Sequence, residues 1–515
     1  MAARSVASRL VFINTIANVL GQIWTKFLAF LIIPWLVHYL DEERFGIYAL
    51  GVSLLVLGTL FDPGMKYGYI KIFSEFLAKG RTGDLRRLMG ASLGAYLAIS
   101  ALMLGVAWVF IEPVMAFLGV PEALFPQAAF FFICILIHLA LAESFAVFRH
   151  AMLAMQRMVW ANKLNAVSAC MHYAFLAMAI VFDWGLPGMG LVFVGAAVFQ
   201  SLLFTAAWLQ LQGQLGHDGP RTPIASLFWY LLRFSWGLKV AANCQTTIFH
   251  LDKIFISRFV SLAAAGTYQI GSTLAVVVRE FMRLGVSALL PAIADMAARD
   301  DRIGLRRVHR QATRLFVCLC APGFFYVAAM APIIIQAWLG SPDSQSALAL
   351  SLLSLAFFAN VILAPSMETA AALHLSRLHM WTALFAAICN IILNYFFVQK
   401  FGFMGPPLAS ILSLSVASII FLARVLHRLD DGFGAFLTNA LLRPIIMAGA
   451  PAMALGWMCR YDLMARLEGA GSIMSLLTLC VAGIIYAVVS LGLILLSGHL
   501  KKPDLDRLRQ MLGRE

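Results

Sequence analysis

The sequence carries little charge. Only 12% of its 515 residues are Asp, Glu, Lys or Arg, whereas 62% are hydrophobic. A soluble domain has roughly a quarter charged residues, so this chain lacks the polar surface that a water-facing globule needs. Apolar runs long enough to cross a bilayer recur from end to end. The composition therefore excludes an ordinary soluble protein and predicts an all-α polytopic membrane protein.

Several chemical signatures are also missing. The sequence has no GxxxxGK[ST] phosphate loop and no HExxH motif, so it predicts neither an ATPase nor a zinc protease. Its eight cysteines and eleven histidines form no CxxC and no paired ligand spacing, so we expect no disulfide framework, no metal and no cofactor. A membrane enzyme acting on lipid-linked sugars would need a sizeable loop, and the predicted outward loops are short. We therefore expect a transporter rather than an enzyme.

The long apolar runs predict about fourteen transmembrane helices. The boundaries of such runs are defined to within roughly two to four residues. The expected spans are 11–37, 45–61, 89–111, 125–147, 164–182, 189–211, 229–257, 264–291, 312–335, 346–368, 380–398, 404–424, 441–459 and 472–496.

The formal net charge of +13 is distributed unevenly. Basic residues cluster in alternate connecting segments, such as 79–87 and 299–314, and in the tail at 501–514. Cytoplasmic loops of inner-membrane proteins carry such an excess, so both termini are predicted in the cytoplasm. This explanation makes a nucleic-acid partner unnecessary. Only five Lys and Arg fall on the predicted outer side: Arg44, Arg258, Lys400, Arg460 and Arg466.

Two short motifs recur at one and the same spacing along the chain. A GxYxxG motif occupies 46–51 and again 266–271, and Leu-Arg-Arg occupies 85–87 and again 305–307. Six predicted helices separate the copies, an even number, so both copies share one orientation and predict a parallel repeat. The expected division is an N-terminal lobe at 1–215 (helices 1–6), a C-terminal lobe at 221–430 (helices 7–12), two additional helices at 440–497 and a basic cytoplasmic tail at 498–515.

Several segments resemble a known transporter family. They are residues 14–48, 61–64 and 74–80 in the first half, with Leu251-Asp252-Lys253 and Ala265-Gly266-Thr267-Tyr268 in the second. Together they resemble the Wzx-type flippases of polysaccharide repeat units, such as O-antigen and exopolysaccharide units. That family belongs to the multidrug/oligosaccharidyl-lipid/polysaccharide exporter superfamily, and the resemblance extends over essentially the whole chain.

The resemblance implies two six-helix lobes around a central cavity and no covalent chemistry. It implies alternating access that moves an undecaprenyl-pyrophosphate-linked oligosaccharide across the inner membrane for polysaccharide or lipopolysaccharide biosynthesis. The expected partners are this polyprenyl-pyrophosphate-linked oligosaccharide, membrane lipids, and a polysaccharide polymerase or export complex.

Polar residues form a stripe on the predicted helix 229–257. Positions 239, 243, 246, 250, 253 and 257 are spaced by three or four residues and share one helical face. Ionisable groups in the membrane cost a few kcal/mol, so they usually face a cavity or a partner. The predicted helix 264–291 carries two arginines four residues apart, Arg279 and Arg283, whose side chains can reach one ligand. The predicted substrate-binding residues are Lys26, Lys239, Asn243, His250, Lys253, Arg279 and Arg283.

Bases outnumber acids in helices 1, 2, 7 and 8, which favours an anionic pyrophosphate. The seven bases are Lys26, Lys66, Lys71, Lys239, Lys253, Arg279 and Arg283, and the four acids are Asp62, Glu75, Asp252 and Glu280. Candidate coupling or gating residues are Asp62, Pro63, Gly64, Lys66, Lys71, Glu143 and Glu368.

Simpler roles stay open for many of these residues. Lys66 and Lys71 could extend to lipid headgroups, and the two buried glutamates could be paired structural residues. Glu280 could neutralise Arg283, and Asp252 could neutralise Lys253. Two other functions also stay open: a multidrug or cation antiporter of the same superfamily, and a membrane-embedded glycan polymerase or ligase.

Overall fold

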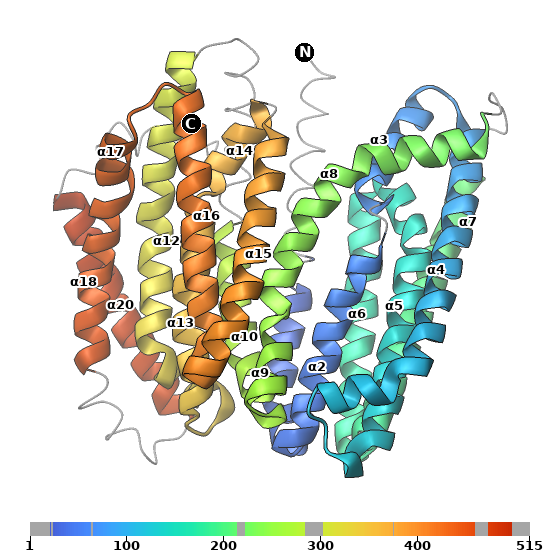
Figure 1. The fold of residues 1–515 in the computed structure, drawn as a ribbon, viewed down its shortest axis with the longest axis horizontal. Helices are drawn as coiled ribbons and strands as arrows, with labels where there is room; N and C mark the ends of the chain where they lie inside the picture. Colours follow the sequence, from blue (N-terminus) through green and yellow to red (C-terminus); the bar gives the residue numbers. More distant parts are fainter. Residues whose placement is uncertain are drawn as a thin grey trace. The chain divides into compact units, whose positions relative to one another are not determined.

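The computed structural model describes residues 21, 24–62, 65–213, 222–283, 302–373, 375–458 and 472–496. Every regular element in these ranges is a helix (Figure 1). Nine helical stretches within them are long and apolar enough to cross a membrane, so the chain is a multi-pass membrane protein. The predicted count of fourteen spans stays a prediction. Contacts divide the chain into two compact units, Met1–Gly266 and Thr267–Glu515.

The helices follow the apolar runs of the sequence. In the first unit they are Trp24–Tyr39, α2 (Glu42–Gly58), the short 3-10 helix Thr59–Phe61, α3 (Met65–Ala78), α4 (Thr82–Phe117), α5 (Phe125–Ala154), α6 (Met158–Val181), α7 (Gly185–Gln212), α8 (Ile224–His250) and α9 (Asp252–Phe259). The next helix, α10 (Leu262–Arg283), crosses the boundary of the units. The second unit continues with α12 (Arg302–Leu339), α13 (Ser344–Val361), α14 (Ala364–Ala372), α15 (Ser376–Phe401), α16 (Gly405–Arg428), α17 (Phe433–Phe436), a π-helix (Leu437–Leu442), α18 (Arg443–Met458) and α20 (Ser472–Leu496).

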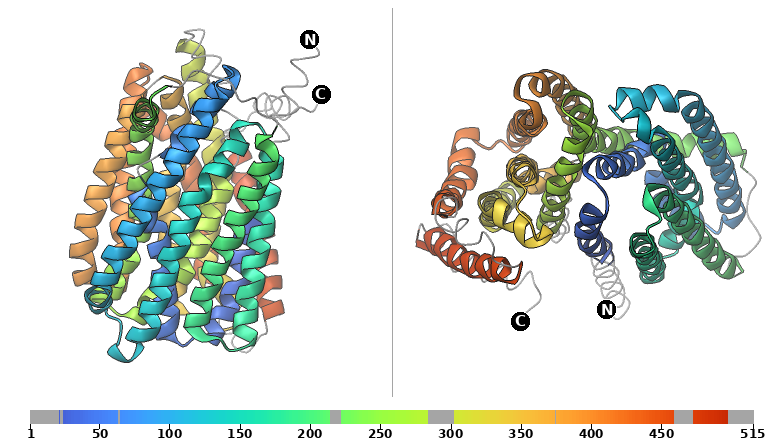
Figure 2. Two further views of the ribbon diagram at one scale, coloured as in Figure 1. Left: turned by 90° about the vertical axis from the view of Figure 1, so that its right-hand side faces the viewer. Right: turned by 90° about the horizontal axis from the view of Figure 1, so that it is seen from below.

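In the first unit α5 packs against α4 and α7, and α3 packs between α5 and α8. Figure 2 shows α4 to α7 running side by side along their length. The aromatic side chains of α3 are buried in this core, where Tyr69 stacks on Phe73 with ring centroids 5.0 Å apart. Leu231 of α8 joins the same cluster. The packing fixes α3 and α8 against each other, beside the residues of the candidate site.

In the second unit α12 packs against α13, α18 and α20, and α15 packs against α16. The contact between α15 and α16 contains a buried polar cluster, in which the Asn390 amide donates to Ser410 Oγ at 3.1 Å and to Ser413 Oγ at 3.3 Å. Small and polar residues of this kind let helices approach closely and bond to each other inside a membrane. The cluster therefore has a packing role.

The bounds of the helices recur at the same spacing as the sequence motifs. α2 begins at Glu42 and α10 at Leu262, α4 begins at Thr82 and α12 at Arg302, and α7 begins at Gly185 and α16 at Gly405. The order and lengths of the elements therefore follow the repeat expected from the sequence. The division into lobes at 1–215 and 221–430, and their parallel arrangement about an axis along the membrane normal, stay predictions.

The two Leu-Arg-Arg motifs make corresponding contacts. Arg86 donates from Nη2 to the carbonyl oxygen of Gln212, at the end of α7, at 2.9 Å. Its counterpart Arg306 pairs through Nη2 with Asp431 Oδ1 at 3.0 Å, just after α16. Each arginine thus ties the start of a long helix to the end of the sixth helix in its own copy. In both copies the motif therefore connects the same two helices, the third and the sixth.

The first glycine of each GxYxxG motif lies at a close approach of two backbones within the first unit. A Cβ atom on Gly46 would lie 2.3 Å from the carbonyl oxygen of Leu262, and one on Gly266 would lie 3.4 Å from the Cα of Gly46. Real Cβ contacts do not reach the first distance, so the start of α2 and the start of α10 can meet only without that side chain. The motif therefore marks a helix crossing.

Candidate functional site

A buried ion pair joins two of the predicted site residues in the first unit. Lys239 Nζ on α8 lies 3.3 Å from Asp62 Oδ2, and the side chains are only 5% and 0% exposed. The same ammonium donates to the carbonyl oxygen of Thr59 at 2.6 Å. That carbonyl lies in the short 3-10 helix after α2, where the helix ends. The interruption of the helix after α2 therefore supplies both a carboxylate, from Asp62, and a carbonyl oxygen, from Thr59, to the lysine.

Tyr96 of α4 completes this arrangement, because its hydroxyl donates to Asp62 Oδ1. Asp62 thus bonds to a tyrosine through one oxygen and to a lysine through the other. Two charges taken out of water are stable only when such further hydrogen bonds accompany them. Glu143 of α5 is half-buried and close enough to act electrostatically on Tyr96. Side chains of α4, α5 and α8 therefore gather around Asp62, and we call Asp62, Tyr96, Glu143 and Lys239 the Asp62 cluster.

The polar stripe expected on helix 229–257 is divided between two helices, which meet at Leu251. α8 ends at His250 and α9 starts at Asp252, although Leu251 keeps helical angles (φ −72°, ψ −27°). Asn243 and His250 are half-buried on α8, whereas Lys253 is 2% exposed on α9. Asp252, the preceding residue, is buried as well. The stripe therefore continues over two helical segments rather than one straight helix.

In the second unit, the predicted site residue Arg279 is also largely buried and forms an ion pair. Its guanidinium pairs with Glu280 Oε1 at 2.6 Å and lies over the ring of Phe357 at 5.1 Å from the centroid. The arginine side chain is 11% exposed and the glutamate 38%. Glu280 thus pairs with Arg279, not with Arg283 as the sequence had allowed. An arginine stacked on an aromatic ring and bonded at one edge is held in a fixed orientation.

Arg283 is exposed at the described end of α10. It acts electrostatically on the half-buried Glu368 of α14 and on His379 of α15. The prediction that Lys239, Lys253, Arg279 and Arg283 point into one central cavity stays a prediction.

The remaining predicted residues are spread over both described and undescribed parts of the chain. Lys26 is exposed on the helix Trp24–Tyr39. Lys71 is exposed on α3, with its ammonium 4.0 Å from the ring centroid of Phe234. Lys66 lies in the first turn of α3. Pro63 and Gly64 lie outside the described residues, as does the basic tail at 498–515.

Comparison with known families gives the fold and the site a context. The sequence profile of a family described as "Polysaccharide biosynthesis protein" matches residues 11–297, more than half of the chain. The chain belongs to this family. No curated protein matches it significantly by sequence. The match agrees with the resemblance to polysaccharide flippases that the sequence motifs indicated.

Three of the solved structures similar to this family member are described as a flippase or as transporters. The lipid II flippase MurJ in an inward closed conformation matches 93% of this chain and 98% of its own, with 13% identity and a TM-score of 0.65. A MATE transporter of Vibrio cholerae matches 84% of this chain and 99% of its own (15% identity, TM-score 0.58). A eukaryotic MATE transporter matches 83% and 96% (12% identity, TM-score 0.58). At such identities the likeness establishes the fold.

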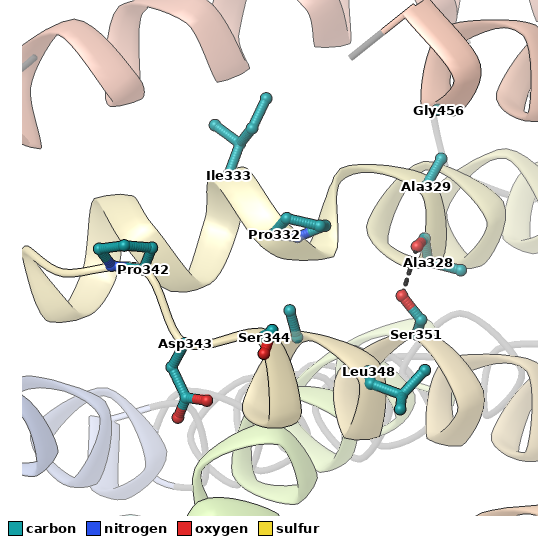
Figure 3. Close-up of a pocket in the computed structure, with 11 residues that line it drawn as sticks. Ala328, Ala329, Pro332, Ile333, Pro342, Asp343, Ser344, Leu348, Ser351 and Gly456 are labelled. Carbon is teal, nitrogen blue, oxygen red and sulfur yellow. Dashed lines mark hydrogen bonds between the residues drawn. The ribbon is translucent and has the colours of Figure 1, made fainter. Parts of the chain in front are cut away.

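The second unit also contains an apolar cavity of about 430 Å³ (Figure 3). Its walls come from α12, including Pro332 and Ile333, and from α13, including Leu348, with Gly456 of α18 nearby. Its acid, Asp343, caps α13 by accepting from the backbone N–H groups of residues 345 and 346. A cavity with this lining offers no base to a phosphate. It is not a site for a pyrophosphate headgroup.

Sequence reasoning missed the most connected part of this family member's site. It placed Lys239 on a polar stripe and Asp62 among the gating residues, without relating the two. The signal available was the acid beside a helix-breaking Pro-Gly, because a charge at such a break needs a partner. Tyr96 gave no signal, since a lone tyrosine in an apolar helix is most often a packing residue.

One further motif has no chemical role. Residues 90–94 read Gly-Ala-Ser-Leu-Gly and match the GxSxG pattern of serine hydrolases. In such enzymes the serine sits on a sharp turn between a strand and a helix. Here the pentapeptide lies inside α4 and Ser92 is buried. Among the described residues no group of His, Cys, Asp and Glu could hold a metal ion either.

Proposed function

We propose that this protein is a flippase that carries an undecaprenyl-pyrophosphate-linked oligosaccharide repeat unit across the inner membrane by alternating access. The family match over residues 11–297 is the observation that carries the proposal, because it links the chain to polysaccharide biosynthesis. The shared fold with a lipid II flippase supports a lipid-linked substrate. Both termini are proposed to lie in the cytoplasm, from the distribution of Lys and Arg.

Arg279 is the proposed principal ligand of the pyrophosphate. A guanidinium presents two parallel N–H groups that match phosphate oxygens, and Phe357 holds its plane in place. Glu280 occupies one edge of the guanidinium at 2.6 Å. Because Glu280 is 38% exposed, it can turn toward water when a phosphate takes its place.

Lys239 has a different proposed role, because it is buried and bonded to Asp62 and Thr59. Its ammonium can reach a pyrophosphate only by leaving the carboxylate. We assign the Asp62 cluster to the change between conformations, with Lys253, Asn243 and His250 continuing the polar path along α8 and α9. When Lys239 exchanges Asp62 for the pyrophosphate, the headgroup becomes coupled to the helix interruption after α2.

The alternative is a multidrug or cation antiporter of the same superfamily, supported by the similarity to MATE transporters. The Asp62 cluster supplies two acids, which a cationic substrate would use. Yet Asp62 already faces Lys239, and a cation would have to compete with a covalently tethered ammonium at 3.3 Å. The charge pattern thus favours the anionic substrate. A glycan polymerase or ligase has no comparable support.

Deletion of the gene tests the proposal. The expected result is accumulation of a lipid-linked glycan on the inner leaflet, restored to export by the wild-type chain. Arg279→Ala should fail to restore export at normal membrane levels, whereas Arg377→Ala, at an exposed arginine of α15, should restore it. Unchanged surface glycan in the deletion strain, together with increased sensitivity to cationic dyes, would favour the antiporter.

A further inference from the structure

A buried hydrogen bond in the second unit joins two helices through residues to which the proposed transport mechanism gives no role. His309 Nε2 of α12 lies 2.9 Å from Ser366 Oγ of α14, and both side chains are fully buried. The histidine ring also contacts Phe436 of α17. The start of α12, α14 and α17 lie at the same end of this unit (Figure 1). We call His309, Ser366 and Phe436 the His309 contact.

The imidazole ring of His309 is held in one orientation. It stacks on the equally buried Phe436, with ring centroids 5.2 Å apart and ring planes inclined by 15°. Nδ1 is buried, and no part of the described chain forms a hydrogen bond with it. A buried N–H without an acceptor costs more than an unused lone pair, so we assign the proton of the neutral ring to Nε2. Nε2 therefore donates from α12 to Ser366 of α14.

The helix that receives this bond is separated from the helix before it. The regular helix is interrupted at Ile362 and Leu363, between α13 and α14. A helix of nine residues, such as α14, is too short to be stable by itself, so its position depends on its contacts. Its buried residues 365, 366, 369 and 370 share one face, whereas the half-buried Glu368 lies on the other. The bond from His309 therefore holds one defined face of α14 against α12.

The first copy of the repeat makes the corresponding contact with apolar side chains. Counted from the starts of α4 and α12, Met89 corresponds to His309. Met89 lies in one hydrophobic cluster with Val147 and Ala151 of α5. There α5 is continuous, whereas the equivalent segment of the second copy is interrupted before α14. A directional hydrogen bond thus replaces an apolar contact in the copy where the helix is interrupted.

The face of α14 opposite the His309 contact carries one of the predicted coupling residues. Glu368 lies close enough to Arg283 of α10 for the arginine to act on it electrostatically. Ser366 and Glu368 are two residues apart and point to opposite sides of the helix. A rotation of α14 about its axis would therefore break the bond from His309 and change the distance between Glu368 and Arg283 at the same time.

We propose that His309 is a positioning residue for transport: its hydrogen bond to Ser366 fixes the rotation of α14 and thereby sets Glu368 against Arg283. This inference rests on the proposed function, because it gives the pair Glu368 and Arg283 a part in the transport cycle. The interruption at Ile362 and Leu363 lets α14 turn independently of α13, and the bond determines when it does.

The test compares two amides that differ only in reach. The side-chain N–H of Gln stands as many bonds from Cα as His Nε2, whereas that of Asn is one bond shorter. Amide hydrogen exchange is measured by mass spectrometry on the purified full-length protein in detergent. His309→Asn should speed exchange of the α14 amides about tenfold, and His309→Gln should stay within about threefold of wild type.

Two further variants test the same bond from its other end and in another place. Ser366→Ala should speed α14 exchange as much as His309→Asn, and it should add nothing to that variant, because both remove the same bond. The matched control is Ser418→Ala, which removes a hydrogen bond from α16 to the carbonyl oxygen of Ala359 on α13. It should leave α14 exchange unchanged.

Glycan export in the deletion strain gives the readout that a purely structural bond would not change. At equal membrane levels His309→Gln should restore export and His309→Asn should not. Equal exchange in the Gln and Asn variants, equal exchange in the Ser418→Ala control, or full export by His309→Asn would each overturn the proposal. Should the Asn variant fail to fold, Ser366→Ala must still speed α14 exchange about tenfold.

Failure of the proposed function has a different signature. Unchanged surface glycan in the deletion strain would overturn the proposed substrate, and with it the role of His309 in transport. The exchange measurement uses no substrate, so it would still show whether His309 holds α14 through Ser366.

Discussion

The ion pair between Lys239 and Asp62 allows the sharpest test of the Asp62 cluster. At 3.3 Å, and at an effective dielectric constant of about 20, the attraction between the two charges is about 5 kcal/mol. Removing one member leaves the other charged and buried, which typically costs about 3–5 kcal/mol. We therefore expect Asp62→Asn and Lys239→Met each to lower the free energy of unfolding by that amount.

The double variant should recover much of this loss, because neither charge is then left alone. In denaturant unfolding of the detergent-solubilised protein, we expect a coupling free energy of at least about 2 kcal/mol between the two positions. The matched control is the pair formed by Glu75 and Lys79, which is shorter at 2.6 Å but has side chains 31% and 58% exposed. An exposed pair should couple by less than about 1 kcal/mol. Equal coupling in the two cycles would show that burial does not decide the strength of the pair, and the reasoning would be wrong.

Three more predictions concern a helix crossing, a ligand and the topology. Gly46→Ala should cost about 1–3 kcal/mol of unfolding free energy, because its Cβ would meet the carbonyl oxygen of Leu262 at 2.3 Å, whereas Gly90→Ala on the open face of α4 should be neutral or stabilising; an equal effect would contradict the crossing. Arg279→Lys should restore glycan export only in part and Arg279→Asp should be worse than Ala, since a point charge cannot reproduce the two-pronged guanidinium; full activity of the Asp variant would exclude a phosphate ligand there. Reporter fusions should place residues 87 and 307 in the cytoplasm and residues 121 and 341 outside, and two reversed signals would overturn the topology.

The parts of the fold that could be predicted are those that depend on a single segment, such as the position of one helix. The apolar run 189–211 became α7, Gly185–Gln212, because a segment that must satisfy its backbone in lipid has hardly any alternative to a helix. The constant spacing between the two copies was also readable, since a repeat leaves equal intervals in the chain. Both inferences use only the order of residues along the chain and need no knowledge of which distant residues touch.

Partners across the chain could not be predicted in the same way. A helical stripe gives the face on which Lys239 lies, but not that Asp62, far earlier in the chain, meets it there. The sequence spacing offered Glu280 to Arg283, whereas the side chains bring it to Arg279.

The two copies of the repeat do not bend at the same places. In the first copy the helix continuing from α2 is interrupted after Phe61, whereas its counterpart α10 is continuous from Leu262 to Arg283. In the second copy the segment equivalent to the unbroken α5 is interrupted between α13 and α14, at Ile362 and Leu363. Breaks in a helix are where it can flex with little loss of packing. We therefore expect the proposed transport cycle to be asymmetric, with each copy contributing a different motion, so that a substitution that stiffens a joint in one copy has no equivalent in the other.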